Sequence, residues 1–256
     1  MKKIITVVLL TAGYSAFSQT TDAEKQLRSQ NADTTLGWKK GAAINVGLSQ
    51  ASLTNWAAGG QNSFSANGLV SLFANYKASN YTWSNSLDLG YGFLQQGKSG
   101  KFIKTDDKID FTSIYGRKAS KNWYYSGLLN FKTQMTDGFN YPNDSVVISK
   151  FLAPGYLIGA IGMEYKPNDN FSVFIAPLTS KSTFVSDQKL ADAGSFGVDK
   201  ATYDGAGVLL TKGKQFRSEF GGYLRMLYKK NLMENVLFQT KLDLFTNYGS
   251  SDIVGG

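Results

Sequence analysis

The sequence predicts an all-β protein, an antiparallel up-and-down β-barrel that crosses a membrane. Three observations lead to this prediction: a long strand pattern with one apolar face, an alternation of long and short connections, and an export signal that no apolar helix follows. The composition agrees, because 27 glycines and 14% aromatic residues accompany only 4 prolines. Proline cannot donate a ladder hydrogen bond, so a chain built of paired strands uses little of it.

The clearest strand pattern lies in Tyr81–Gln95. Alternate residues form an apolar set with aromatics toward both ends and leucines between: Tyr81, Trp83, Asn85, Leu87, Leu89, Tyr91 and Phe93. The other set is polar or small, apart from its last member: Thr82, Ser84, Ser86, Asp88, Gly90, Gly92 and Leu94. A strand sends successive side chains to opposite faces. A transmembrane strand needs about 9–11 residues with aromatics at both interfaces, whereas a soluble strand has about 5–6 residues. The length and the pattern therefore favour a membrane strand.

Similar but weaker patterns predict about nine strands, with connections that alternate in length. The other expected strands are Lys39–Gln50, Asn62–Ala78, Lys108–Ala119, Trp123–Gln134, Leu152–Lys166, Phe171–Val185, Lys214–Lys229 and Asn235–Tyr248. The long connections are Ala51–Gln61, Gln96–Asp107, Met135–Lys150 and Ser186–Gly213, and the short ones are Ser79–Asn80, Ser120–Asn122, Pro167–Asp169 and a turn near Asn231. Outer-membrane barrels have short periplasmic turns and long extracellular loops.

The chain divides into three parts. Residues 1–18 read as a signal peptide, with a basic start, an apolar core and a small-x-small cleavage site that ends at Ser18. Residues 19–36 are polar and aperiodic, which predicts a flexible periplasmic lead-in, and 37–256 form the barrel domain. An odd strand number leaves an open edge that hydrocarbon cannot solvate. We therefore expect the barrel to be C-terminally incomplete.

The residue types present exclude most familiar catalytic sites. The chain has no His and no Cys, which excludes Ser-His-Asp and Cys-His nucleophile arrangements and removes the usual zinc ligands. Asp106 and Asp107 are the closest carboxylate pair, and are better explained as solvated loop residues. The four aspartates of the longest loop match no compact calcium-binding spacing: Asp187, Asp192, Asp199 and Asp204. We therefore expect no catalytic residue, cofactor or metal site.

Charged residues on the polar strand faces are the candidate functional residues. Those expected to face the lumen are Asp88, Asp110, Lys132, Arg217, Glu219, Arg225, Lys241 and Asp243. In a narrow barrel such charges pair and fill the interior, whereas in a wider one they line water and set selectivity. The net charge of +8 indicates either a solvated surface or attraction for anionic headgroups or solutes. Nucleic acid is not an expected partner, because the basic residues are scattered along an exported chain.

Several blocks of the sequence resemble the domain-of-unknown-function 3078 family. The blocks are residues 49–65 (SQASLTNWAAGGQNSFS), 104–120, 152–169, 176–185 and 216–248. The resemblance implies an exported protein of a Bacteroidetes-type outer membrane, with further strands beyond this endpoint. Three more strands would give an even-numbered barrel of about twelve. It offers no substrate and no catalytic residues to carry over.

These observations favour a non-enzymatic integral outer-membrane β-barrel, acting either as a narrow pore or as a structural or interaction protein of the envelope. Its expected partners are outer-membrane lipid and either small solutes or envelope proteins. The alternative is an outer-membrane hydrolase or acyltransferase on a barrel scaffold, which the lack of a histidine base disfavours. A secreted soluble β-protein is the third hypothesis, and the alternation of long and short connections argues against it.

Overall fold

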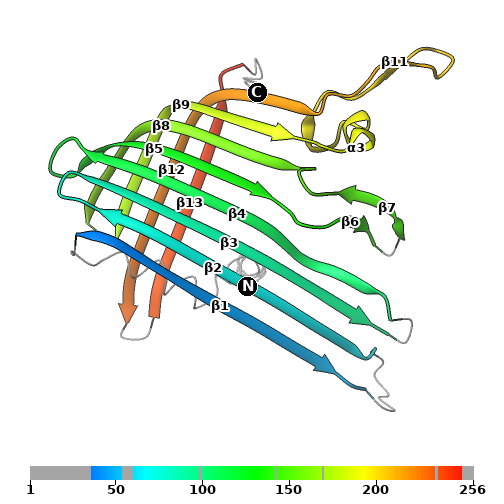
Figure 1. Cartoon of the computed structure of the whole chain (residues 1–256), viewed down its shortest axis with the longest axis horizontal. Coiled ribbons are helices and arrows are strands. Elements are labelled where there is room, and N and C mark those ends of the chain that lie inside the picture. The colour runs from blue at the N-terminus through cyan, green and yellow to red at the C-terminus, as the bar shows by residue number, and fades with distance from the viewer. Residues whose placement is uncertain are drawn as a thin grey trace, which may run out of the picture.

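The protein is a nine-stranded antiparallel sheet whose strands follow one another in chain order (Figure 1). The computed structural model describes residues 36–53, 60–97, 100–141, 143–168, 170–233 and 236–249. The sheet consists of β1 (Gly37–Ala51), β2 (Ser63–Lys77), β3 (Tyr81–Gln96), β4 (Phe102–Lys118), β5 (Trp123–Thr133), β8 (Gly155–Asn168), β9 (Phe171–Phe184), β12 (Phe216–Met233) and β13 (Val236–Asn247). The predicted all-β, up-and-down antiparallel architecture is confirmed. The predicted signal peptide and nearly all of the lead-in lie outside the described residues.

Two strand ends differ from the sequence prediction. The predicted loop Gln96–Asp107 is wrong, because β3 runs to Gln96 and β4 already begins at Phe102. The pairing of these strands shifts register between Gly92 and Phe93, which leaves Thr105 without an opposite residue. Such a bulge breaks the period-two pattern on which the prediction depended. The turn predicted near Asn231 is also wrong, because β12 extends to Met233.

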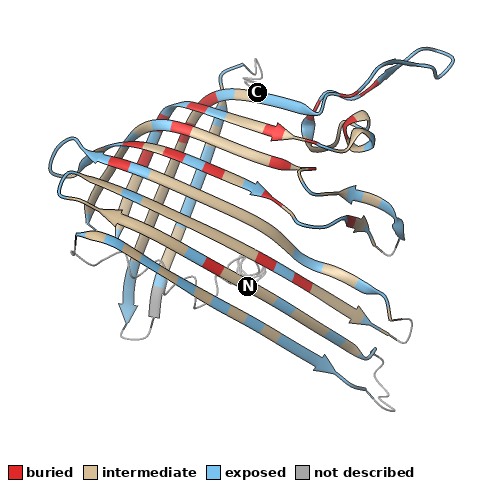
Figure 2. Cartoon of the chain, viewed as in Figure 1, coloured by how far each residue is buried: buried red, intermediate tan, exposed pale blue. Residues whose placement is uncertain are grey.

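The sheet curls, so that strands distant along it approach each other across one face. In Figure 1, β12 and β13 pass behind the strands at the front of the sheet. Buried Leu128, Phe174 and Tyr223 belong to β5, β9 and β12, and they form one cluster with Ala160 and Ala176. Phe245 from β13 packs against this cluster. We call the side of the sheet that carries it the concave face. Figure 2 places most buried positions on β5, β8, β9 and β12.

Connections of two to four residues leave one end of the sheet and those of five to 31 residues leave the other. The predicted alternation of length therefore holds, although 97–101 is much shorter than predicted. The short connections are residues 78–80, 119–122, 169–170 and 234–235, and the long ones are 52–62, 97–101, 134–154 and 185–215. Small elements fold within two long connections: β6 (Gly138–Asn140) with β7 (Asn143–Ser149), and α3 (Gln188–Asp192), η2 (Ser195–Gly197), β10 (Thr202–Tyr203) and β11 (Leu209–Thr211). No helix among the residues that the structure describes is long and apolar enough to cross a membrane.

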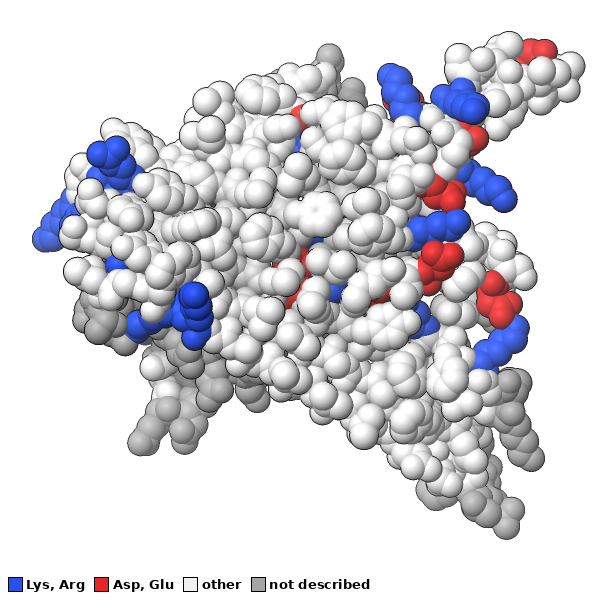
Figure 3. Space-filling model, in the orientation of Figure 1, with Lys and Arg blue, Asp and Glu red and all other residues white. Residues whose placement is uncertain are grey.

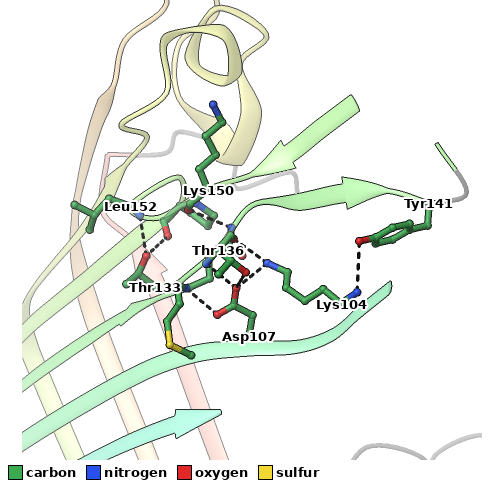
Figure 4. A network of polar contacts seen from close by, with 10 residues as sticks. Lys104, Asp107, Thr133, Thr136, Tyr141, Lys150 and Leu152 are labelled. Atoms are coloured by element: carbon green, nitrogen blue, oxygen red, sulfur yellow. Dashed lines mark hydrogen bonds and ion pairs between the residues drawn. The ribbon is translucent and has the colours of Figure 1, made fainter. Parts of the chain in front are cut away.

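A polar network ties the 134–154 connection to the sheet (Figure 4). The Asp107 carboxylate accepts hydrogen bonds from the backbone N–H groups of Met135 and Thr136 at 2.7 and 2.9 Å. It also pairs with the Lys104 ammonium at 2.7 Å. At the other end of the connection, the Thr133 hydroxyl donates to the Pro154 carbonyl at 2.9 Å. Both ends of this connection are therefore fixed to strands of the sheet.

The 185–215 connection has its own small core and a capped helix. Ala153, Val185, Ala191 and Val198 are buried together. Asp187 caps α3 by accepting from the Leu190 N–H at 3.1 Å, and its other carboxylate oxygen pairs with Lys150 at 2.7 Å. The hydrogen bond from Lys150, followed by that from the Leu190 N–H, holds the pKa of the Asp187 carboxyl below its ordinary value. The ion pair joins the two structured connections.

Acidification should loosen α3 through this residue. Because folding lowers the Asp187 pKa, its carboxylate stabilises the connection above the ordinary carboxyl pKa of about 3.9, and that stability is lost as the pH falls through the lowered value. Hydrogen exchange of a peptide covering residues 185–193, corrected for intrinsic rates, should show protection at pH 6 that declines below about pH 4. The Asp187→Asn variant should lack this step. An identical step in both proteins would assign the effect to another group.

Replacing two glycines of β8 by alanine should change the stability of the protein in different ways. A Cβ on Gly162 would collide with the backbone carbonyl of Ile175, whereas a Cβ on Gly159 would have no atom within 4 Å. Gly162→Ala should therefore lower the free energy of unfolding by about 1–3 kcal/mol, as overpacking does. Gly159→Ala should be neutral or slightly stabilising, since alanine loses less chain entropy. Urea unfolding of the two variants in detergent measures the difference, and equal destabilisation would contradict it.

Candidate functional site

One face of the sheet exposes apolar side chains and hides polar ones. On β1, Ile44, Val46 and Leu48 are 72%, 70% and 71% exposed, while Asn45 and Gly47 between them are half-buried. A water-soluble sheet usually shows the reverse arrangement, with its apolar face against a core. We call this exposed side the outward face, and it lies opposite the concave face.

The outward face continues across all nine strands through the strand register. Ile44 lies opposite Val70, Val70 opposite Leu89, and Leu89 opposite Ile109. The same alternation places further apolar side chains on this face: Leu72, Leu87, Phe111, Leu129, Phe131, Leu157, Ile161, Ile175, Leu178, Leu224, Met226, Leu242 and Leu244. Together these residues form what we call the apolar band.

An aromatic belt borders the apolar band at the short-connection end. Its ring contacts run along neighbouring strands: Trp38–Tyr76 at 5.2 Å, Trp38–Trp83 at 5.8 Å, Tyr76–Tyr81 at 5.5 Å, Tyr81–Tyr115 at 5.8 Å, Trp123–Tyr165 at 4.9 Å, Phe171–Tyr228 at 6.5 Å and Tyr228–Phe238 at 6.3 Å. The rings of Trp and Tyr join an apolar body to a polar tip, which suits a boundary between hydrocarbon and water.

A second aromatic belt borders the band at the long-connection end. Its contacts are Phe64–Phe93 at 6.2 Å, Phe93–Phe102 at 5.1 Å, Phe184–Phe216 at 5.2 Å and Phe220–Tyr248 at 5.9 Å. Trp83 and Phe93 of β3 mark the two belts. Ten residues of strand span about 33 Å, or about 25 Å across a membrane at a tilt of about 40°. In Figure 3, charged residues gather at the two ends of this face.

The eight charged residues predicted to face a lumen all belong to the concave face by register. Asp243 is the centre of one group, on β13. Its carboxylate accepts from Tyr223 Oη, from Arg225 Nε at 2.8 Å and from Lys241 Nζ at 3.0 Å. Arg225 lies directly opposite Asp243 in the register of β12 and β13. The structure therefore brings three of the predicted residues together on one carboxylate.

The other five predicted residues lie in separate contacts. Lys132 pairs with Asp110 at 3.3 Å, and Asp110 also accepts from the Asn130 amide at 2.7 Å. Asp88 accepts from the Ser71 hydroxyl at 2.5 Å. Arg217 pairs with Glu219 at 2.9 Å, and Lys181 approaches the same carboxylate at 3.5 Å.

Sequence reasoning missed Lys181 because of a bulge in β9. The register with β8 shifts between Ile161 and Met163. Before the shift the even-numbered residues of β9, such as Phe174 and Ala176, face the concave side, and after it the odd-numbered residues, such as Thr179 and Lys181, do so. Pro177, next to the shift, was the available signal in the sequence. Proline inside a sheet is confined to edge strands, strand starts or bulges, but its presence alone does not tell which face Lys181 takes.

The remaining acidic candidates are not brought together. Asp106 faces the concave side near Gly90, whereas Asp107 points outward and is held by Met135 and Thr136. The interpretation of both as loop residues is wrong, since both lie in β4. Asp106 is exposed, as expected, whereas the Asp107 side chain is only 2% exposed. Asp187, Asp199 and Asp192 contact Lys150, Lys214 and Gln188 respectively. Among the described residues, no group of acidic side chains could hold a metal ion.

Comparison with known protein families supports the resemblance read from the sequence. Residues 48–139 match the model of a family described as protein of unknown function (DUF3078). The match agrees with the resemblance over this segment, which runs from the end of β1 to β6. No curated protein matches the chain. The family description gives no activity.

Removing the Asp243 carboxylate should destabilise the concave face. Asp243→Ala leaves the partly buried Arg225, the more exposed Lys241 and the Tyr223 hydroxyl without their shared acceptor. We expect the free energy of unfolding to fall by about 1–3 kcal/mol, the usual cost of losing such partners. Asp106→Ala is the matched control, since Asp106 is exposed and has no hydrogen bond or ion pair among the described residues. Urea unfolding that shows equal losses would refute the role of Asp243.

Proposed function

We propose that this protein is a non-enzymatic integral protein of a bacterial outer membrane, which crosses the bilayer with the strands of a β-barrel. The observation that carries the proposal is the apolar band between two aromatic belts, on the face opposite the charged groups. The family that residues 48–139 match is described as being of unknown function, so the proposal rests on the surface chemistry of the chain.

The apolar band is too exposed and too continuous for a surface in contact with water. Contiguous exposed apolar patches on soluble monomers seldom exceed a few hundred square ångströms. Here Ile44, Ile161 and Leu178 are 72%, 67% and 55% exposed on separate strands of one band. Lipid tails can cover such a surface at little cost, and for the strands between β1 and β13 the sheet ladder satisfies the backbone groups that hydrocarbon cannot solvate.

The concave face favours a structural protein or a narrow pore over an open channel. Its charges are paired or hydrogen-bonded at Asp243, Asp110 and Glu219. The cluster around Leu128 and Phe174 fills part of the space that the curled sheet encloses. Paired charges and packed side chains are typical of small barrels, whose interiors are filled. On this proposal the short connections face the periplasm and the long ones face outward.

A pair of substitutions on adjacent residues of β3 tests the proposal. Leu89→Arg would put a cation on the outward face, and should cost about 2–4 kcal/mol if this position lies near the bilayer midplane. Asp88→Asn, on the concave face, keeps an acceptor for the Ser71 hydroxyl and should be far milder. The measurement is urea unfolding of protein folded into lipid vesicles, followed by the heat-modifiable migration of the folded form.

A charged side chain is costly on an outward face that contacts lipid and is tolerated on the concave face, so the two substitutions should differ clearly in their effect on stability. Equal effects of the two substitutions would mean that the outward face does not contact lipid. Failure of the unmodified full-length protein to enter vesicles, with no heat-modifiable form, would overturn the proposal itself.

A further inference from the structure

The charged residues of the described part of the chain fall into three groups, which differ in the numbers of basic and acidic residues. The concave face carries six basic residues (Lys108, Lys132, Lys181, Arg217, Arg225, Lys241) and six acidic ones (Asp88, Asp106, Asp110, Glu164, Glu219, Asp243). The long-connection end carries seven of each: Lys101, Lys104, Lys150, Lys189, Lys200, Lys212, Lys214, and Asp107, Asp137, Asp144, Asp187, Asp192, Asp199, Asp204. Both groups are therefore neutral overall.

The short-connection end is different, because all its described charged residues are basic. They are Lys39, Lys40, Lys77, Arg117, Lys118, Lys121, Lys166, Lys229 and Lys230, and we call this set the basic rim. In Figure 3 the left end of the molecule shows Lys and Arg without Asp or Glu, whereas the right end shows both. Asp169 and Glu234 belong to the short connections but lie outside the described residues. The basic excess remains when these two are counted.

The two ends of the sheet also differ in how many of their basic side chains form ion pairs. At the long-connection end, Lys101, Lys150 and Lys214 each form an ion pair with an aspartate. At the basic rim, Lys40, Arg117 and Lys230 are exposed, and no carboxylate of the described residues pairs with them. Among the described residues, the long-connection end balances its own charge, whereas Lys40, Arg117 and Lys230 of the basic rim have no carboxylate partner and can be balanced from outside.

Three members of the basic rim lie on the outward face beside the aromatic belt. Lys40 Nζ lies 5.4 Å from the centroid of the Trp38 ring. Arg117 is opposite Tyr81 on one side and Tyr125 on the other. Lys230 is opposite Phe238. Long basic side chains at this depth lay their stems along apolar surface and raise their charges to the headgroup level.

We propose that the basic rim binds the headgroups of anionic phospholipids in the leaflet at the short-connection end. This inference rests on the proposed function, since it needs the belt to lie at a membrane interface. Each basic side chain near an anionic lipid surface raises the binding constant about fivefold. Because the opposite end is neutral, the preference for anionic lipid belongs to one leaflet.

Quenching of the belt tryptophans by brominated lipids tests the proposal. Trp38, Trp83 and Trp123 lie at the short-connection end, and Trp56, from the long connection after β1, is replaced by Phe in every version. The full-length protein is folded into vesicles of phosphatidylcholine and phosphatidylglycerol, with either lipid brominated. The triple variant Lys40→Gln, Arg117→Gln, Lys230→Gln is compared with the matched control Lys189→Gln, Lys200→Gln, Lys212→Gln, three exposed lysines of the 185–215 connection.

We expect brominated phosphatidylglycerol to quench preferentially, with a relative binding constant of about five or more that declines as salt rises. The rim variant should bring this ratio to about one, and the control variant should leave it unchanged. Equal quenching by both brominated lipids in the unmodified protein would overturn the headgroup site while leaving the membrane location intact. No quenching by either lipid would instead refute the proposed function. A preference that both variants reduce equally would indicate net charge and not the rim.

Discussion

The structure depends on one constraint, which is that an unbroken hydrogen-bonded ladder makes side chains alternate strictly between two surroundings. Every residue of β3 from Thr82 to Gly92 is paired on both sides, with β2 and with β4. Leu89 and Asp88 are therefore committed to opposite faces whatever their neighbours are. A slip of one residue would exchange the two faces along the whole strand, so the register is strongly specified. The apolar band, both belts and the concave charges all follow from this alternation.

The sequence predicted the strands and their faces because alternation is a local property. Leu87, Leu89, Trp83 and Phe93 could be assigned from β3 alone, and all eight concave charges were placed on the polar side. Their partners could not be assigned in the same way. Pairing Arg225 with Asp243 requires the register between two strands, and a single uncounted residue in a turn changes that register. The small elements within the long connections were missed because segments of two to seven residues carry too little pattern.

Bulges account for the errors within the strands. The shift between Gly92 and Phe93 hid the start of β4, and the shift near Pro177 hid the inward position of Lys181. In each case one extra residue reverses the parity that a period-two reading assumes. Because of the bulge, each strand can continue beyond it, but the other set of alternate side chains then faces the concave side.

The first bulge also shows how the two ends of the apolar band are terminated by different chemistry. It leaves Asp107 on the outward face, where an uncovered carboxylate would be costly beside hydrocarbon. The backbone amides of Met135 and Thr136 and the ammonium of Lys104 cover it, so that its side chain is 2% exposed. At this end the protein supplies the donors from its own folded connections. At the other end the connections are too short to fold over the sheet, and Trp, Tyr and the exposed side chains of Lys40, Arg117 and Lys230 meet the surroundings directly. Under the proposed function, this chemical difference between the two ends would orient the chain in a bilayer.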